Sequence, residues 1–127
     1  MEKILAFQIE EGEMQKLKRI VKQIKTNLII VEQSAYRQTL ENLLEQKRNP
    51  LVEAYKGNQI TESMIVMEGF TEKRFEQLLK MLREQQVKLD FKAVVTPFNK
   101  KWTVLQLYLE MERERAAYRK KELGLEE

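Results

Sequence analysis

A short apolar segment runs into a turn that carries several polar and charged side chains. They are Lys92, Thr96, Asn99, Lys101 and Trp102. In open α/β sheets, ligands bind beyond the carboxyl ends of strands, and a helix N-terminus offers unpaired N–H groups to an anion. The pattern therefore predicts a binding site for a small anionic ligand or a protein partner at residues 96–102.

The same turn also has a purely structural interpretation. Asn99 could cap a following helix, Thr96 could bond to the turn backbone, and Trp102 could fill the core. The segment has no glycine-rich loop of the kind that holds nucleotide phosphates. The sequence leaves the functional and the structural interpretation open.

Lysines of the first predicted helix form a second group that could do chemistry. Lys18, Lys22 and Lys25, together with Lys100 beyond the turn, could contact the phosphates of a nucleic acid. A solvent-exposed helix face explains these lysines more simply. The 23 basic and 20 acidic residues are spread over both halves and give a net charge of only +3, so nucleic-acid binding is allowed but not indicated.

Two glutamates each follow a predicted strand. If Glu32 and Glu68 met in space, they could serve as the carboxylate pair of a hydrolase or as magnesium ligands. This would make the chain a carboxylate-dependent enzyme, which is the weakest of the three hypotheses.

Histidine and cysteine are both absent from the 127 residues. Histidine is the side chain best suited to proton transfer near neutral pH and a common transition-metal ligand, and cysteine is required for thiolate chemistry. We therefore expect no metal or other cofactor. The composition favours a non-enzymatic binding or regulatory module for a protein partner or a small anionic ligand.

The beginning of the sequence bears on location. Met1-Glu2-Lys3 leads into a strand-like segment without the pattern of a signal peptide, and no apolar run approaches the about 20 residues that cross a bilayer. We expect a cytoplasmic protein without a membrane partner.

Hydrophobic periodicity divides the first half, residues 1–50, into four elements. It predicts a strand over 4–9, an amphipathic helix carrying Met14, Leu17, Val21 and Ile24, a strand over 28–31, and a helix carrying Leu40, Leu43 and Leu44. Ser34 is the predicted cap of that last helix, and Asn49-Pro50 its predicted end.

A connector over 51–63 leads to a second half, residues 64–119, in the same order. The hydrophobic pattern there predicts a strand over 64–67, a helix capped by Thr71, a strand over 91–95, and a long helix capped by Asn99. Residues 120–127 are strongly charged, and we expect the last helix to protrude and to fray beyond about Arg119.

The two halves repeat one pattern of elements. An offset of about 61 residues superposes the first strands and helices, and one of about 65 superposes the later elements. The predicted fold is a single α/β domain over 1–127, with a four-stranded mixed sheet covered by helices and two similar strand-helix-strand-helix halves.

A homodimer is a further expectation. Tyr108, Met111, Ala116 and Tyr118 could form an apolar strip on the last helix that a second copy would cover. Pairing of edge strands could make a dimer equally well.

Two motifs in the second half are characteristic. They are Glu68-Gly69-Phe70-Thr71, and Lys92-Ala93-Val94-Val95-Thr96 followed by Asn99 and Trp102. On these motifs, residues 64 to about 117 resemble the bacterial domain of unknown function 3783 (DUF3783) family. The resemblance covers a little under half of the chain and implies no activity, substrate or partner.

Overall fold

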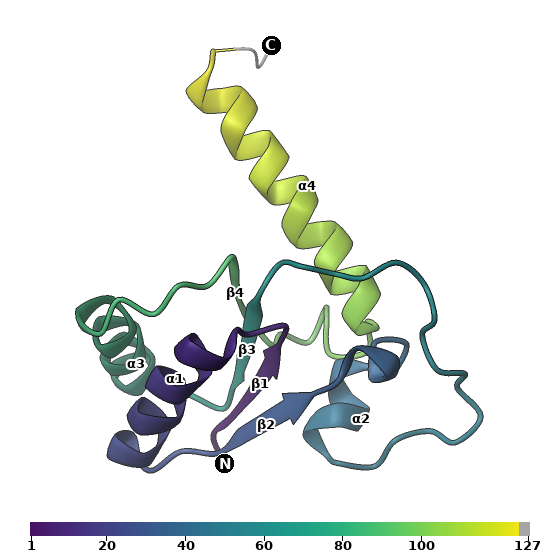
Figure 1. The fold of residues 1–127 in the computed structure, drawn as a ribbon, viewed down its shortest axis with the longest axis horizontal. Helices are drawn as coiled ribbons and strands as arrows, with labels where there is room; N and C mark the ends of the chain where they lie inside the picture. The colour runs from purple at the N-terminus through teal and green to yellow at the C-terminus, as the bar shows by residue number, and fades with distance from the viewer. Residues whose placement is uncertain (125–127) are drawn as a thin grey trace.

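Four short strands form an open mixed sheet in the computed structural model, which describes residues 1–124 (Figure 1). The strands are β1 (Lys3–Phe7), β2 (Leu28–Val31), β3 (Met64–Glu68) and β4 (Phe91–Val94), in the order β2-β1-β3-β4. β1 is parallel to β2 and β3 is parallel to β4, while the central pair β1 and β3 is antiparallel. The predicted four-stranded mixed sheet is confirmed.

Helices cover both faces of the sheet. On one face, α1 (Glu11–Ile24) and α3 (Glu72–Glu84) pack on the side chains of Ile4 and Met67. On the other face, the short α2 (Leu40–Leu44) and the long α4 (Val104–Glu122) pack on Leu5 and Val66. Because both faces are buried, the central strands are apolar along nearly their whole length, which is why their sequences do not alternate.

The two halves are related by an approximate two-fold rotation about the central strand pair. A residue with positive φ ends the first strand of each half, at Gln8 and Gly69, and another follows each first helix, at Lys25 and Gln86. These pairs are separated by 61 residues, as the sequence predicts. The connection from α3 to β4 is longer than that from α1 to β2, so the offset rises to 64 at Thr39 and Thr103, which precede α2 and α4.

Both predicted caps of the second helices are wrong. Ser34 lies in a 3₁₀-helix (Gln33–Ala35), and α2 is capped by Thr39 and already ends at Leu44 rather than at Asn49-Pro50. The long helix starts at Val104, where Thr103 and Gln106 form a capping box, and not after Asn99. The cap predicted at Thr71 is confirmed, because its hydroxyl accepts a hydrogen bond from the backbone N–H of Arg74.

The far part of α4 stands out from the body (Figure 1). Arg115 makes its last contacts with the body: its guanidinium lies 4.7 Å from the ring centroid of Phe91 and 3.6 Å from the carboxylate of Glu62. From Ala116 to Glu122 every side chain is exposed. The predicted protrusion is confirmed. The helix extends through Glu122, fraying beyond Arg119 stays a prediction, and residues 125–127 of the predicted tail lie outside the described residues.

Candidate binding site

A pocket of about 320 Å³ lies between the β4 edge of the sheet and residues 107–114 of α4. Four of the five residues that the sequence singled out line it: Lys92, Thr96, Asn99 and Trp102. Lys101 is exposed and does not line it. The motif therefore does bring most of its side chains to one place, although no helix begins there.

Asn99 holds the turn that forms the floor of this pocket. Its side chain is buried, and its Oδ1 accepts a hydrogen bond of 2.8 Å from the backbone N–H of Thr96. Its Nδ2 donates a hydrogen bond of 3.0 Å to the carbonyl of Val94 at the end of β4. Both polar ends of Asn99 are therefore used inside the turn.

The hydroxyl of Thr96 closes the same turn from the other side. Its Oγ1 accepts hydrogen bonds of 3.2 Å from the backbone N–H groups of Phe98 and Asn99. These are the donors that would otherwise face an anion at the end of the strand. The structural interpretation of Thr96 and Asn99 therefore accounts for their contacts.

The carboxylates around the pocket also weigh against an anionic ligand. Glu110 and Glu114 line its wall from α4, opposite Lys92 on β4. Glu110 lies 3.1 Å from Arg113, whereas Glu114 has no salt-bridge partner within residues 1–124. The pocket therefore presents carboxylate to a ligand.

Large apolar side chains surround the pocket and lie open to solvent. Phe98, at the tip of the turn, is 87% exposed, and Val94 on β4 is 45% exposed. Met111 and Trp102 pack against the core behind the pocket and are only partly buried. An exposed aromatic ring beside a partly apolar pocket is typical of a surface that contacts another protein.

The free edge of β4 borders the same pocket. Phe91 donates its backbone N–H to Ser63 and Val95 donates its own to Met67, so alternate residues of β4 face β3. By this alternation the backbone groups of Lys92 and Val94 point away from the sheet. No strand within residues 1–124 pairs with this edge.

Glu32 and Glu68 do not form a carboxylate pair. Glu32 directly follows β2, and Glu68 is the last residue of β3. These two strands run in opposite directions, so the two carboxylates lie at opposite ends of the sheet. Glu32 is engaged by Arg48 through two hydrogen bonds of 2.8 Å, which lower the pKa of its carboxyl to about 2. The arrangement that a carboxylate-dependent enzyme would need is absent at these two residues.

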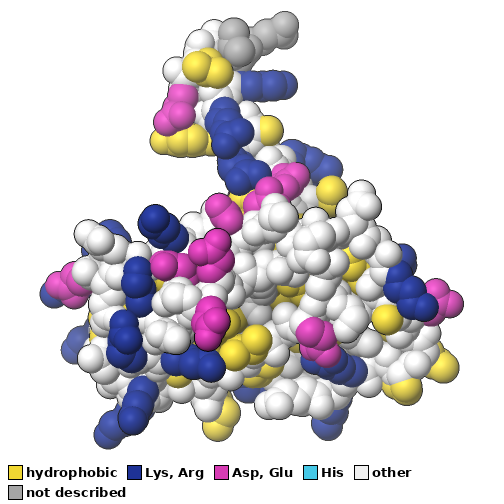
Figure 2. All heavy atoms as spheres, viewed as in Figure 1, with side chains coloured by type: hydrophobic (Ala, Val, Ile, Leu, Met, Phe, Trp, Pro, Cys, Tyr) yellow, Lys and Arg dark blue, Asp and Glu magenta, His cyan; other side chains and the backbone are white. Residues whose placement is uncertain are grey.

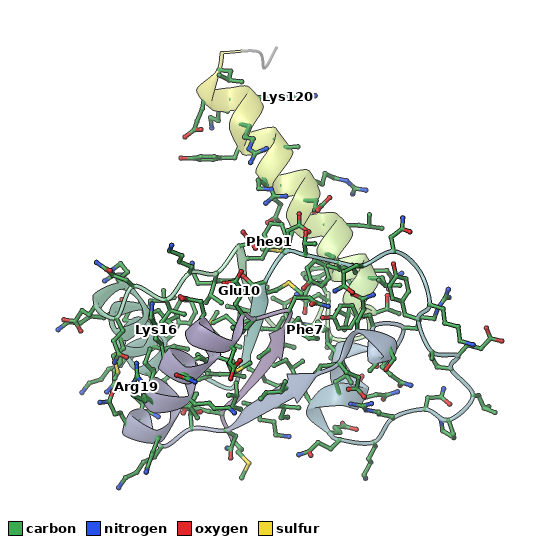
Figure 3. All side chains as sticks on the ribbon, in the orientation of Figure 1. Phe7, Glu10, Lys16, Arg19, Phe91 and Lys120 are labelled. Carbon is green, nitrogen blue, oxygen red and sulfur yellow. The ribbon has the colours of Figure 1, made fainter. Side chains whose placement is uncertain are left out.

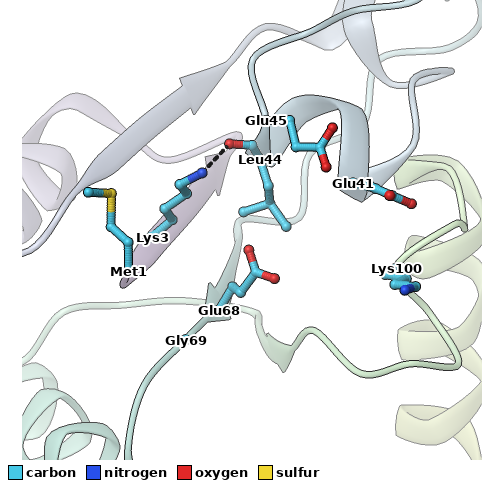
Figure 4. A pocket seen from close by; sticks show the side chains of 8 residues that line it. All are labelled: Met1, Lys3, Glu41, Leu44, Glu45, Glu68, Gly69 and Lys100. Carbon is cyan, nitrogen blue, oxygen red and sulfur yellow. Dashed lines mark hydrogen bonds between the residues drawn. The ribbon is translucent and has the colours of Figure 1, made fainter.

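A second pocket, of about 460 Å³, lies where Glu68 meets the N-terminal end of β1 (Figure 4). Glu41, Glu45 and Glu68 share its lining with Lys3 and Lys100, and the Nζ of Lys3 donates a hydrogen bond of 2.7 Å to the carbonyl of Leu44. No group of three potential metal-ligating residues is close enough to hold a metal ion in the part of the chain that the structure describes.

The basic residues of the nucleic-acid hypothesis do not share one surface. Lys18, Lys22 and Lys25 are exposed on α1 and at its C-terminal end, whereas Lys100 lines the pocket near α2 on the other face of the sheet. Figure 3 shows Lys16 and Arg19 on the same helix. Lys16 donates a hydrogen bond to the carbonyl of Gln86 and so links α1 to the end of α3. Nucleic-acid binding by α1 stays a prediction.

The sequence reasoning missed Phe98, Glu110, Met111 and Glu114 as parts of the site. The sequence does contain a signal for Phe98. Between Pro97 and Asn99 this large apolar side chain lies in a tight turn, from which it does not reach the core. The α4 residues carry no such signal, since their place depends on where the helix begins.

Comparison with known proteins gives one match. Residues 63–118 match the family model described as "Domain of unknown function (DUF3783)", which confirms the resemblance seen in the sequence. No curated protein and no solved structure matches the chain. Among the helices of residues 1–124, none is long and apolar enough to cross a membrane.

Proposed function

We propose that the chain, whose residues 63–118 match the model of the DUF3783 family, is a non-enzymatic module that binds an extended segment of a partner protein along the free edge of β4. One observation carries the proposal: an unpaired strand edge borders a pocket that also has an exposed aromatic residue, Phe98. Peptides bind to such edges by adding a strand, with main-chain hydrogen bonds for affinity and side-chain pockets for specificity.

The backbone of β4 supplies the hydrogen bonds. The N–H and C=O of Lys92 and the N–H of Val94 face outward, while the carbonyl of Val94 already accepts from Asn99. The free edge is therefore short, and an added segment pairs over a few residues only. Most of the specificity must come from its side chains.

The pocket defines which side chains fit. Side chains of an added strand alternate between the two faces, so one of them enters the pocket beside Phe98, Trp102 and Met111. This position suits an apolar side chain. A neighbouring lysine or arginine would reach Glu114, whose carboxylate is exposed.

The test begins with random peptides displayed on phage and selected on the wild-type protein. Enriched peptides are synthesised, and their affinity is measured for wild type and for Val94→Pro and Phe98→Ala. Proline at position 94 removes the outward N–H without removing a hydrogen bond to β3, so the sheet is kept. We expect Val94→Pro to abolish binding and Phe98→Ala to weaken it about tenfold, the effect of losing an interface contact of about 1.4 kcal/mol.

The two-fold symmetry provides a matched control. Ile30 on the outer edge of β2 corresponds to Val94 and is 53% exposed. Ile30→Pro makes the same change on the opposite edge, and we expect it to leave peptide binding intact. Thermal unfolding confirms that each variant folds. Equal loss of binding in both proline variants, or enriched peptides that lack an apolar residue, would contradict the proposal.

A further inference from the structure

The protruding part of α4 has no counterpart in the first half. α2 ends at Leu44, which corresponds to Tyr108 at the offset of 64 residues, and Tyr108 is also the last buried residue of α4, beyond which Met111 packs only partly against the core. We call residues 109–122 the arm. The helix continues through Glu122, beyond its last body contact at Arg115, so this part gains no stability from packing within the single chain, which is the main source of helix stability in proteins.

Exposed apolar side chains lie on one stripe of the arm and its cap. Leu109 is 65% exposed and Leu123, directly after the helix, is 71% exposed. Ala116 lies midway between them, seven residues from each, and is also exposed. Residues seven apart fall on one face of a helix, and a small residue at the centre allows a second helix to approach closely. The apolar strip predicted from the sequence was partly wrong, because Tyr108 and Met111 pack into the body.

The net charge of the arm changes sign along its length. Its base carries Glu110, Glu112 and Glu114 with Arg113 and Arg115 between them, a net charge of −1, and its far end carries Arg119, Lys120 and Lys121 before Glu122, a net charge of +2. Figure 2 shows acidic side chains at the base of the arm and mostly basic ones along its far part, where one acidic side chain is also seen, and Figure 3 places Lys120 near its tip. An antiparallel copy therefore brings opposite net charges together, whereas a parallel copy brings like net charges together.

We propose that two copies of the chain form a homodimer by antiparallel packing of their arms, with the two-fold axis at Ala116. This arrangement places Leu109 of each copy against Leu123 of the other, and Glu112 of each copy near Arg119 of the other. It rests on the arm and on the body surface beside Leu109, and it does not depend on the β4 edge.

The body provides a receptor for the end of the second arm. A pocket of about 400 Å³ beside Leu109 is lined by Tyr55, Ile60, Leu105 and Tyr108. From residue 109 to residue 123 a helix extends about 21 Å at 1.5 Å per residue. An antiparallel copy therefore presents Leu123 to this pocket, where its side chain is removed from water, while the two bodies stay at opposite ends of the helix pair.

The oligomeric state is measured by sedimentation equilibrium of the full chain over a range of concentrations. The contact between two arms is small, so we expect a weak dimer with a Kd on the order of micromolar. Leu123→Asp is expected to raise this Kd at least tenfold without changing the melting temperature, because Leu123 is exposed in the single chain. Glu112→Lys is expected to weaken the dimer, and the double variant Glu112→Lys with Arg119→Glu to restore it.

Cross-linking determines the orientation, because the chain has no native cysteine. In an equimolar mixture of Leu109→Cys and Leu123→Cys, we expect oxidation to yield mainly the mixed dimer, with little cross-linking of Leu109→Cys alone. A chain that stays monomeric at high concentration would overturn the proposal. So would a dimer that cross-links 109 to 109, or one that survives Leu123→Asp and is lost in Val94→Pro.

Discussion

Thr39 and Thr103 cap the second helices of the two halves, and their backbones meet in an antiparallel β-bridge. The hydrogen bonds around the bridge are reciprocal: the N–H of Leu40 donates to Trp102 at 2.9 Å, and the N–H of Val104 donates to Gln38 at 3.2 Å. Helices α2 and α4 thus start from one shared junction, which joins the halves a second time outside the sheet.

We expect removal of either threonine hydroxyl to destabilise the protein. Thr39 Oγ1 accepts from the N–H of Asn42, and Thr103 Oγ1 accepts from that of Gln106. Thr39→Ala and Thr103→Ala should each lower the free energy of unfolding by about 1 kcal/mol, the usual effect of losing an N-cap. Urea denaturation measures the change. Thr61→Ala, in the exposed connector, is the control and should stay within about 0.5 kcal/mol of wild type.

The sequence of residues 96–104 does not show whether Asn99 or Thr103 caps α4. Asn99 and Thr103 are both good N-cap residues, and each is followed by a helix-compatible stretch. Tertiary contacts decide, because the side chain of Asn99 is bound to Val94 and Thr96, and the backbone of Thr103 is held by the bridge to Thr39. The strands were predictable within one or two residues, since their apolar runs are bounded by turn residues and helix-favouring polar ones.

Asn99→Ala provides a direct test of whether this turn is structural. The substitution removes both side-chain hydrogen bonds and leaves the carbonyl of Val94 and the N–H of Thr96 without these partners. We expect the free energy of unfolding to fall by about 2 kcal/mol, since a buried polar group without its partner costs about 1 to 3 kcal/mol. Chemical denaturation gives the value, with exposed Lys101→Ala as the control. An unchanged stability together with lost peptide binding would instead favour a direct binding role for Asn99.

Two positions with positive φ in the second half should respond to substitution with opposite signs. Gly69 has φ of +79°, and a Cβ built there would lie 2.5 Å from the backbone oxygen of Met1, so Gly69→Ala should destabilise the protein by more than about 1 kcal/mol. Gln86 has φ of +53° and an exposed side chain. Gln86→Gly should raise stability by up to about 1 kcal/mol, because only glycine adopts this conformation without steric cost. Calorimetry of both variants checks the signs, and destabilisation by Gln86→Gly would contradict the strain argument.

The candidate site was predictable only in part, for a physical reason. Lys92 and Trp102 come together because both belong to one strand-turn segment, so their proximity is local in sequence. Glu110 and Glu114 reach the pocket through the packing of α4, and the direction of β3 relative to β1 determines where Glu32 and Glu68 lie. Strand direction depends on how the halves assemble, and nothing in the local sequence of either half encodes it.

The ion pair of Glu32 and Arg48 predicts a specific pH dependence. Hydrogen bonds from Arg48 lower the pKa of Glu32 from 4.5 to about 2. A carboxyl whose pKa is lower in the folded state stabilises the protein fully above its unfolded pKa, and this contribution is lost as pH falls from about 4.5 to about 2. Both side chains are about half exposed, so solvent screening limits the effect to at most about 1 kcal/mol.

Arg48→Ala should therefore be less stable than wild type at neutral pH and equally stable near pH 2. An NMR titration of the Glu32 carboxyl should show its pKa return toward 4.5 in Arg48→Ala and stay low in Lys47→Ala, an exposed neighbour outside the ion pair. A wild-type pKa near 4.5 would mean that the ion pair does not persist in solution.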